Sequence, residues 1–180
     1  KTQSVEYVKN SSGTPTLKLD NTGIVSGQIV ELGFANTTSA QTFSGGVTLS
    51  GSNGTSNKIK IASGATDYSK EQIFSGAITG GNTLVKDGAG RLVLTGDSTS
   101  SFTGNITVDD GTLVIGNGSG DGSNLDSDNT ITINKGKLEI ADNESVTLTA
   151  QGGTGKSIIG GKGTIAAATI GNGAGEIDYI

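Results

Sequence analysis

Two segments of eleven residues match each other position by position, and this match constrains the fold more than any other feature. They read NITVDDGTLVI at 105–115 and TITINKGKLEI at 130–140, with Gly111 and Gly136 at the same place. A related version, LVKDGAGRLVL, occupies 84–94 with Gly90 in the bend. Offsets of roughly 21 to 31 residues between like segments are typical of solenoid repeats.

Apolar residues recur two positions apart, as in Ile106/Val108 and Ile131/Ile133. This spacing places both side chains on one face of a β-strand. Like strands recur once per unit in the same direction, so they are expected to stack in parallel. We therefore predict an all-β fold, a single-stranded parallel β-helix (solenoid) of about six or seven coils. The main alternative is a tandem β-sandwich, which would show hairpins and usually a buried tryptophan, and the chain has no tryptophan.

Three of the four phenylalanines open the phrase Phe-(Ser/Thr)-Gly, and they are Phe43, Phe74 and Phe102. If the coils stack in register, these rings should form one internal column. The glycine two residues after each ring should lie at a corner where a Cβ does not fit. Those glycines are Gly45, Gly76 and Gly104.

Composition excludes several classes of function. The chain has no cysteine and no histidine, so it has no disulfide, thiolate zinc site, histidine ligand or Ser-His or Cys-His nucleophile. A net charge of −5 argues against nucleic acid as a partner. The apolar runs are too short to span a bilayer, so we expect no direct membrane insertion of this segment. We expect no cofactor and no enzymatic activity.

The segment 116–129 interrupts the second repeat and holds the calcium candidates Asp121, Asp126 and Asp128. Oxygen-rich loops bind calcium, but this spacing fits neither the helix–loop–helix calcium loop nor the tandem glycine-aspartate repeat. Glycine and aspartate are also typical of solvated loops, and we favour that interpretation.

Two other charged positions have structural interpretations. Asp109 and Asp110 are adjacent, so in a strand they point to opposite faces and do not form an obvious catalytic pair. Lys86 follows Leu84 by two residues and nominally shares its inward face. Because a buried lysine needs a partner, we expect the strand to bend first and Lys86 to extend toward solvent.

The segment Leu84–Leu113 resembles the strand repeat associated with autotransporter passenger domains. The matching positions are Leu84, Lys86, Gly88, Gly90, Leu92, Leu94, Gly96, Phe102, Thr103, Gly104, Thr107, Val108, Gly111, Thr112 and Leu113. The resemblance implies a right-handed parallel β-helix that is exported through the outer membrane and displayed at the bacterial cell surface. It fixes no activity, since such repeats usually form the stalk.

We predict two regions: N-terminal strands at 1–40, as a cap or the first coils, and β-helix repeats at 41–180, cut from a longer chain. The leading hypothesis is a non-catalytic stalk or spacer of an autotransporter-like surface protein, with an adhesive role left open. The alternatives are a β-helical carbohydrate-binding or polysaccharide-cleaving domain and a homotypic adhesion module. The partners left open are a glycan or protein on a host or cell surface, and self-association.

Overall fold

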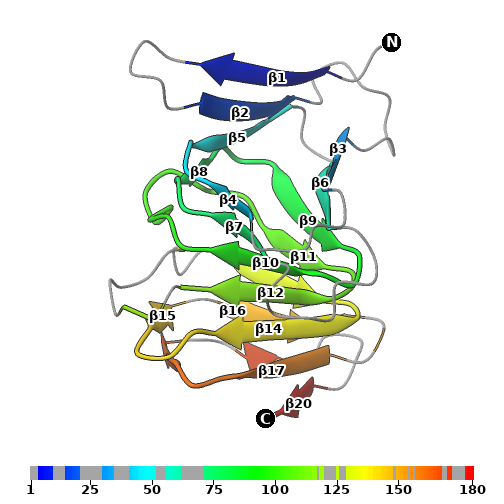
Figure 1. Cartoon of the computed structure of the whole chain (residues 1–180). Helices are drawn as coiled ribbons and strands as arrows, with labels where there is room; N and C mark the ends of the chain where they lie inside the picture. The colour runs from blue at the N-terminus through cyan, green and yellow to red at the C-terminus, as the bar shows by residue number, and fades with distance from the viewer. Residues whose placement is uncertain are drawn as a thin grey trace.

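The computed structural model of the chain describes residues 4–9, 15–20, 30–34, 41–51, 56–61, 71–116, 118–119, 125, 129–147, 149–153, 155, 157–167, 170–171 and 177–180. Within these residues the secondary structure is entirely β. Figure 1 shows short strands stacked along one axis, with the N-terminus at one end of the stack and the C-terminus at the other.

Two sheets of seven strands run along this stack, and each turn of the chain adds one strand to both. The first contains β4 (Gln41–Phe43), β7 (Gln72–Phe74), β10 (Arg91–Leu94), β12 (Thr112–Ile115), β14 (Gly136–Ile140), β17 (Ser157–Gly161) and β20 (Ile177–Tyr179). The second contains β3 (Val30–Phe34), β6 (Ser56–Ile61), β9 (Thr83–Asp87), β11 (Ile106–Val108), β13 (Thr130–Ile133), β16 (Thr149–Gly152) and β19 (Ile170–Gly171). We call them the β4–β20 sheet and the β3–β19 sheet.

A third side is covered less continuously. It holds β1 (Ser4–Lys9), β2 (Pro15–Asp20), β5 (Val47–Ser50) and β8 (Ile78–Thr79) in one sheet, and β15 (Ser145–Thr147) with β18 (Thr164–Ala167) in another. Between them, Gly80 forms an isolated parallel bridge with Phe102.

The register confirms the repeat alignment. Ile106 pairs with Ile131 in the β3–β19 sheet, and Leu113 pairs with Leu138 in the β4–β20 sheet. All strand pairs in these two sheets are parallel. The predicted class, an all-β parallel solenoid, is therefore confirmed.

Two details differ from the expectation. The number of coils differs slightly from the six or seven expected. The strands at the N-terminal end also include an antiparallel pair, β1 with β2, whereas β2 pairs in parallel with β5. The division of the chain at residue 40 stays a prediction.

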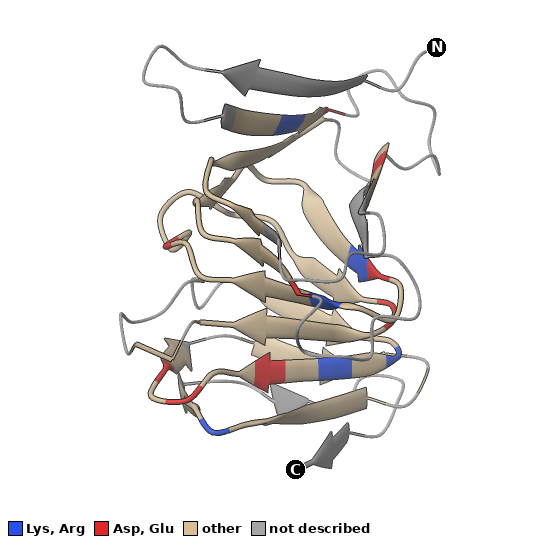
Figure 2. Ribbon diagram, viewed as in Figure 1, with Lys and Arg blue, Asp and Glu red and all other residues tan. Residues whose placement is uncertain are grey.

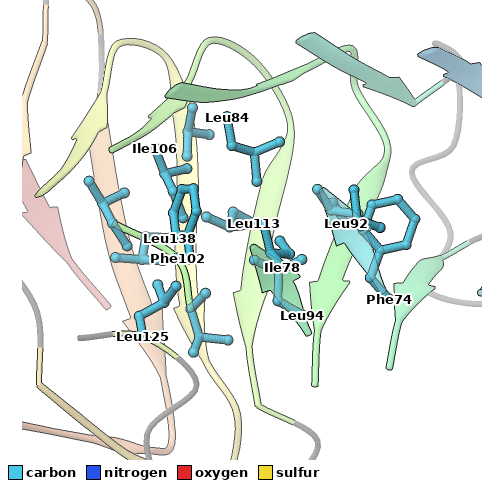
Figure 3. Packing of buried hydrophobic residues seen from close by; sticks show 14 of the residues in the cluster. Phe74, Ile78, Leu84, Leu92, Leu94, Phe102, Ile106, Leu113, Leu125 and Leu138 are labelled. Carbon is cyan, nitrogen blue, oxygen red and sulfur yellow. The ribbon is translucent and has the colours of Figure 1, made fainter. Parts of the chain in front are cut away.

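One continuous core fills the interior. It begins with Leu17 and Leu19 of β2 and extends to Ile159 of β17. Inward-facing side chains such as Ile106 and Leu113 are fully buried, and Figure 3 shows how aliphatic side chains from successive strands meet there. Because alternate residues point inward, the two-residue apolar spacing of the sequence becomes the wall of this core.

Candidate functional site

The most unusual residue of the interior is Lys86, which is 0% exposed. It lies on β9, in register with Val108 of the next turn, and therefore on the inward face. The expectation that Lys86 reaches solvent is wrong, because β9 continues to Asp87 before the chain bends. The strand therefore keeps Lys86 on the same side as Leu84.

Backbone carbonyl groups at the bend accept the hydrogen bonds of the buried ammonium. The Nζ of Lys86 donates to the carbonyl oxygens of Asp87 at 3.0 Å, Gly88 at 2.6 Å and Asp110 at 3.0 Å. A lysine ammonium has three N–H donors, so these contacts use all of them. Asp110 belongs to the next turn, and the side chain therefore joins two successive bends.

The charge of Lys86 is affected by two opposing influences. Burial lowers the pKa of Lys86 to about 8, and the nearby carboxylates of Asp110 and Asp87 oppose the decrease. The ammonium form is stabilised by carbonyl dipoles and by these carboxylates, while desolvation favours the neutral amine.

Glycines make room for this arrangement. Gly111 has a φ of +71°, and a Cβ there would collide with the carbonyl oxygen of Gly88 and would lie 2.8 Å from the Nζ of Lys86. A Cβ on Gly136, whose φ is +120°, would collide with the carbonyl oxygen of Gly111. Gly90 directly precedes Arg91, and Gly111 directly precedes Thr112, which is the register partner of Arg91. The predicted bend glycines Gly90, Gly111 and Gly136 thus form one column.

The strands just described, β9 to β12, lie in a segment whose sequence matches a known family. Residues 84–115 match the family model of the passenger-associated-transport-repeat. This match confirms the resemblance seen in the sequence, and both halves of the Lys86 site fall inside the repeat. The repeat suggests an autotransporter passenger segment and implies a secreted or surface-exposed protein. No curated protein and no solved structure matches the chain.

The predicted phenylalanine column is correct for two of its three members. Phe43 pairs with Phe74 in register, and their ring centroids lie 6.1 Å apart at an interplanar angle of 67°. The next residue in that column is Leu94, not Phe102. Phe102 is buried among the core side chains (Figure 3), and on the third side of the solenoid it bridges to Gly80. The inclusion of Phe102 in the column is therefore wrong.

The predicted column of corner glycines needs the same correction as the phenylalanine column. A Cβ on Gly76 would collide with the carbonyl of Gly45, and a Cβ on Gly96 would collide with that of Gly76. Gly104 is also crowded, but by the carbonyl of Asn82. The column beyond Gly45 and Gly76 is thus continued by Gly96, while Gly104 belongs to another corner. The signal available for this assignment was the Leu-x-Gly sequence at 94–96, which has the same spacing as Phe-x-Gly at 74–76.

Asn129 is a structural residue that sequence reasoning missed. Its side chain is 1% exposed, and its Nδ2 donates to the carbonyl oxygens of Phe102 at 3.1 Å and Gly104 at 2.7 Å. Asn129 lies immediately before β13, one turn after Gly104. Its side chain therefore supplies hydrogen bonds to two backbone carbonyl groups at a corner of the preceding turn.

The acidic candidates do not gather into a site among the described residues. Asp109 accepts a hydrogen bond of 2.8 Å from the side chain of Asn134, and Asp110 lies 3.9 Å from the ammonium of Lys135. The residues that replace the two aspartates in the next repeat are thus their stacking partners. Asp121, Asp126 and Asp128 lie outside the described residues. In the described part, no group of three or more potential metal ligands comes together.

A groove of about 660 Å³ lies on the outer face of the β4–β20 sheet. Its floor includes Val93 and Val114, and charged side chains of Glu71, Arg91 and Glu139 line it. Figure 2 shows both basic and acidic residues along β14, a strand of this sheet. Arg91 pairs with both acidic side chains, with Glu71 at 2.8 Å and with Glu139 at 3.0 Å.

The pairing shifts the pKa values of both Arg91 and Glu139. Burial alone would lower the pKa of Arg91, but the hydrogen bonds to Glu139 and Glu71 outweigh it and raise the pKa above its ordinary value. The hydrogen bond from Arg91 lowers the pKa of Glu139, against the effect of burial. Both groups are therefore held in their charged forms.

In the described part of the chain, no helix has the length and hydropathy needed to cross a membrane.

Proposed function

We propose that this chain is a non-catalytic structural spacer within an autotransporter-like passenger at the bacterial cell surface. The observation that carries the proposal is the parallel register that runs from β4 to β20 over one continuous core. The passenger-associated repeat at 84–115 lies within this stack and supports the same interpretation.

The role of a stiff spacer follows from the direction of the hydrogen bonds between turns. Hydrogen bonds between turns run along the axis of the stack, so each turn adds about 4.8 Å of length and is tied to both neighbours. Loops leave the turns without interrupting the sheets, and such loops are where binding to a surface glycan, to a protein or to a second copy would arise. Adhesion is a secondary part of this proposal.

The charged groove does not favour a polysaccharide-cleaving enzyme. Glycoside hydrolysis needs one carboxylic acid and one carboxylate placed across the substrate. Glu71 and Glu139 face the groove, but Arg91 binds both. Because this pairing stabilises the ionised carboxylate of Glu139, that residue is poorly suited to act as a general acid.

Inserting whole turns tests the proposal. Leu84 pairs with Ile106, so residues 84–105 constitute one turn and can be duplicated without breaking register. Five added copies should lengthen the particle in small-angle scattering by about 24 Å. A matched insertion of residues 84–94, half a turn, should disrupt folding instead. A spacer role would be contradicted if whole-turn insertions do not lengthen the particle, or if the purified chain depolymerises a polysaccharide panel.

A further inference from the structure

Arg91 makes a contact that passes over one turn of the solenoid. Arg91 lies on β10 and is in register with Thr112 of β12, which in turn is in register with Lys137 of β14. Its guanidinium donates from Nη1 and Nη2 to the carboxylate of Glu139 at 3.0 and 3.2 Å. Glu139 is on β14, so the ion pair joins strands that are not neighbours.

The same guanidinium also holds the preceding turn. Its Nε donates to the carboxylate of Glu71 at 2.8 Å. Gln72 is in register with Leu92, which places Glu71, the residue just before β7, beside Arg91. The pair with Glu71 is therefore a contact between neighbouring turns, whereas the pair with Glu139 reaches two turns away in the other direction.

This difference matters because a solenoid is nearly one-dimensional. Its stability is approximately the sum of the stability of each repeat and of each interface between neighbours, so opening can begin at any interface. A bond between β10 and β14 breaks when either the β10–β12 or the β12–β14 interface opens. It therefore couples two interfaces that the backbone hydrogen bonds treat separately.

The contact is well placed to have a measurable effect. The side chains of Arg91 and Glu139 are only 11% and 19% exposed. Two parallel hydrogen bonds between a guanidinium and a carboxylate are stronger and more directional than a single exposed pair. By contrast, the pair of Lys135 with Asp110 spans 3.9 Å with 71% and 39% exposure, and such pairs contribute little.

We propose that the Arg91–Glu139 ion pair is a clamp that makes β10, β12 and β14 open as one cooperative unit. The passenger-associated repeat ends at residue 115, within β12. The clamp therefore links the repeat to the turn that follows it.

Hydrogen exchange measured by mass spectrometry on the purified 180-residue chain tests the clamp. In the unchanged chain, slow amides of β10, β12 and β14 should exchange together. In Glu139→Gln, which keeps the size of the side chain, β14 should exchange about tenfold faster than β10. In the matched control Glu71→Gln, β7 should separate from β10, while β10 and β14 should still exchange together.

A second variant guards against a folding defect in Glu139→Gln. Arg91→Lys keeps the positive charge but cannot form the two parallel hydrogen bonds, so β14 should again exchange faster than β10, by a smaller factor. The clamp is disproved if β14 stays coupled to β10 in both variants. It is equally disproved if Glu71→Gln separates β14 from β10 as much as Glu139→Gln does.

Discussion

The Nζ of Lys86 donates a hydrogen bond of 2.6 Å to the carbonyl oxygen of Gly88, two residues further along the chain and inside the solenoid. A third carbonyl acceptor, that of Asp110, comes from the next turn. A cation thus binds backbone carbonyl groups of two successive bends, where the chain turns from one sheet to the other.

Replacing Lys86 by methionine tests this contribution to stability. Methionine has a similar length and no donor, so it removes the three hydrogen bonds that Lys86 donates to carbonyl groups at the bends. We expect the free energy of unfolding at pH 7 to fall by about 1–3 kcal/mol. Chemical denaturation measures the change. Equal stability of Lys86→Met and the unchanged chain would show that these hydrogen bonds contribute nothing.

The pH dependence of stability provides an independent test of Lys86. Its pKa is about 8 in the folded chain, against the ordinary lysine value of 10.5 that applies when the chain is unfolded, so between these values the unfolded chain binds more protons. The unchanged chain should therefore gain stability as the pH rises from about 8 to about 10.5, by up to about 3 kcal/mol. Lys86→Met should lack this gain. Parallel pH profiles of the two proteins would contradict the shift.

Substitution of Gly111 tests the close approach of two bends. Gly111→Ala places a Cβ against the carbonyl of Gly88 in a residue with φ of +71°, so we expect a loss of about 2–4 kcal/mol. Gly46→Ala is the matched control, because a Cβ at Gly46 meets only the carbonyl oxygen of Ala77, at 3.5 Å. Thermal unfolding should show a large decrease for the first variant and little change for the second.

A double-mutant cycle tests the corrected assignment of the phenylalanines. Phe43 and Phe74 are in ring contact, so their alanine variants should couple by about 0.5–1.5 kcal/mol. Phe43 and Phe102 should show no coupling, although Phe102→Ala alone should still cost about 3–5 kcal/mol through a cavity. Coupling of Phe43 with Phe102 as strong as with Phe74 would restore the single column.

Asn129 provides a test of the buried amide. Asn129→Asp replaces a donor that serves two carbonyl oxygens with a carboxylate that repels them, and we expect a loss of about 3 kcal/mol or more at pH 7. Acidification should reduce this loss relative to Asn129→Ala, because a protonated carboxyl group can donate one hydrogen bond. If the two variants respond alike to pH, the Nδ2 contacts are not what stabilises the corner.

Features that repeat at short range could be predicted from the sequence. The spacing of Ile106 and Val108 predicted which side chains face inward, and the match of 105–115 with 130–140 predicted parallel pairing. The alignment of Gly111 with Gly136 predicted where the chain bends. Each of these depends only on strand geometry and on the similarity of two segments.

Contacts between turns of unequal length could not be predicted in the same way. Leu92 pairs with Gln72, Leu113 with Leu92 and Leu138 with Leu113, so the offset between register partners changes from turn to turn. The phrase around Phe102 looks like the phrase around Phe74, but the shorter turn places Leu94 on the ring of Phe74 instead. Local similarity was therefore misleading at that position.

From the order of its amino acids alone, this chain could be assigned to the parallel solenoids, with an apolar lining and glycine bends, because those properties depend on residues close together along the chain. The partners of Lys86, Asn129 and Arg91 were decided only when the turns were stacked. Each of these side chains bonds to at least one group a full turn or more away, and the length of every intervening loop determines which group that is.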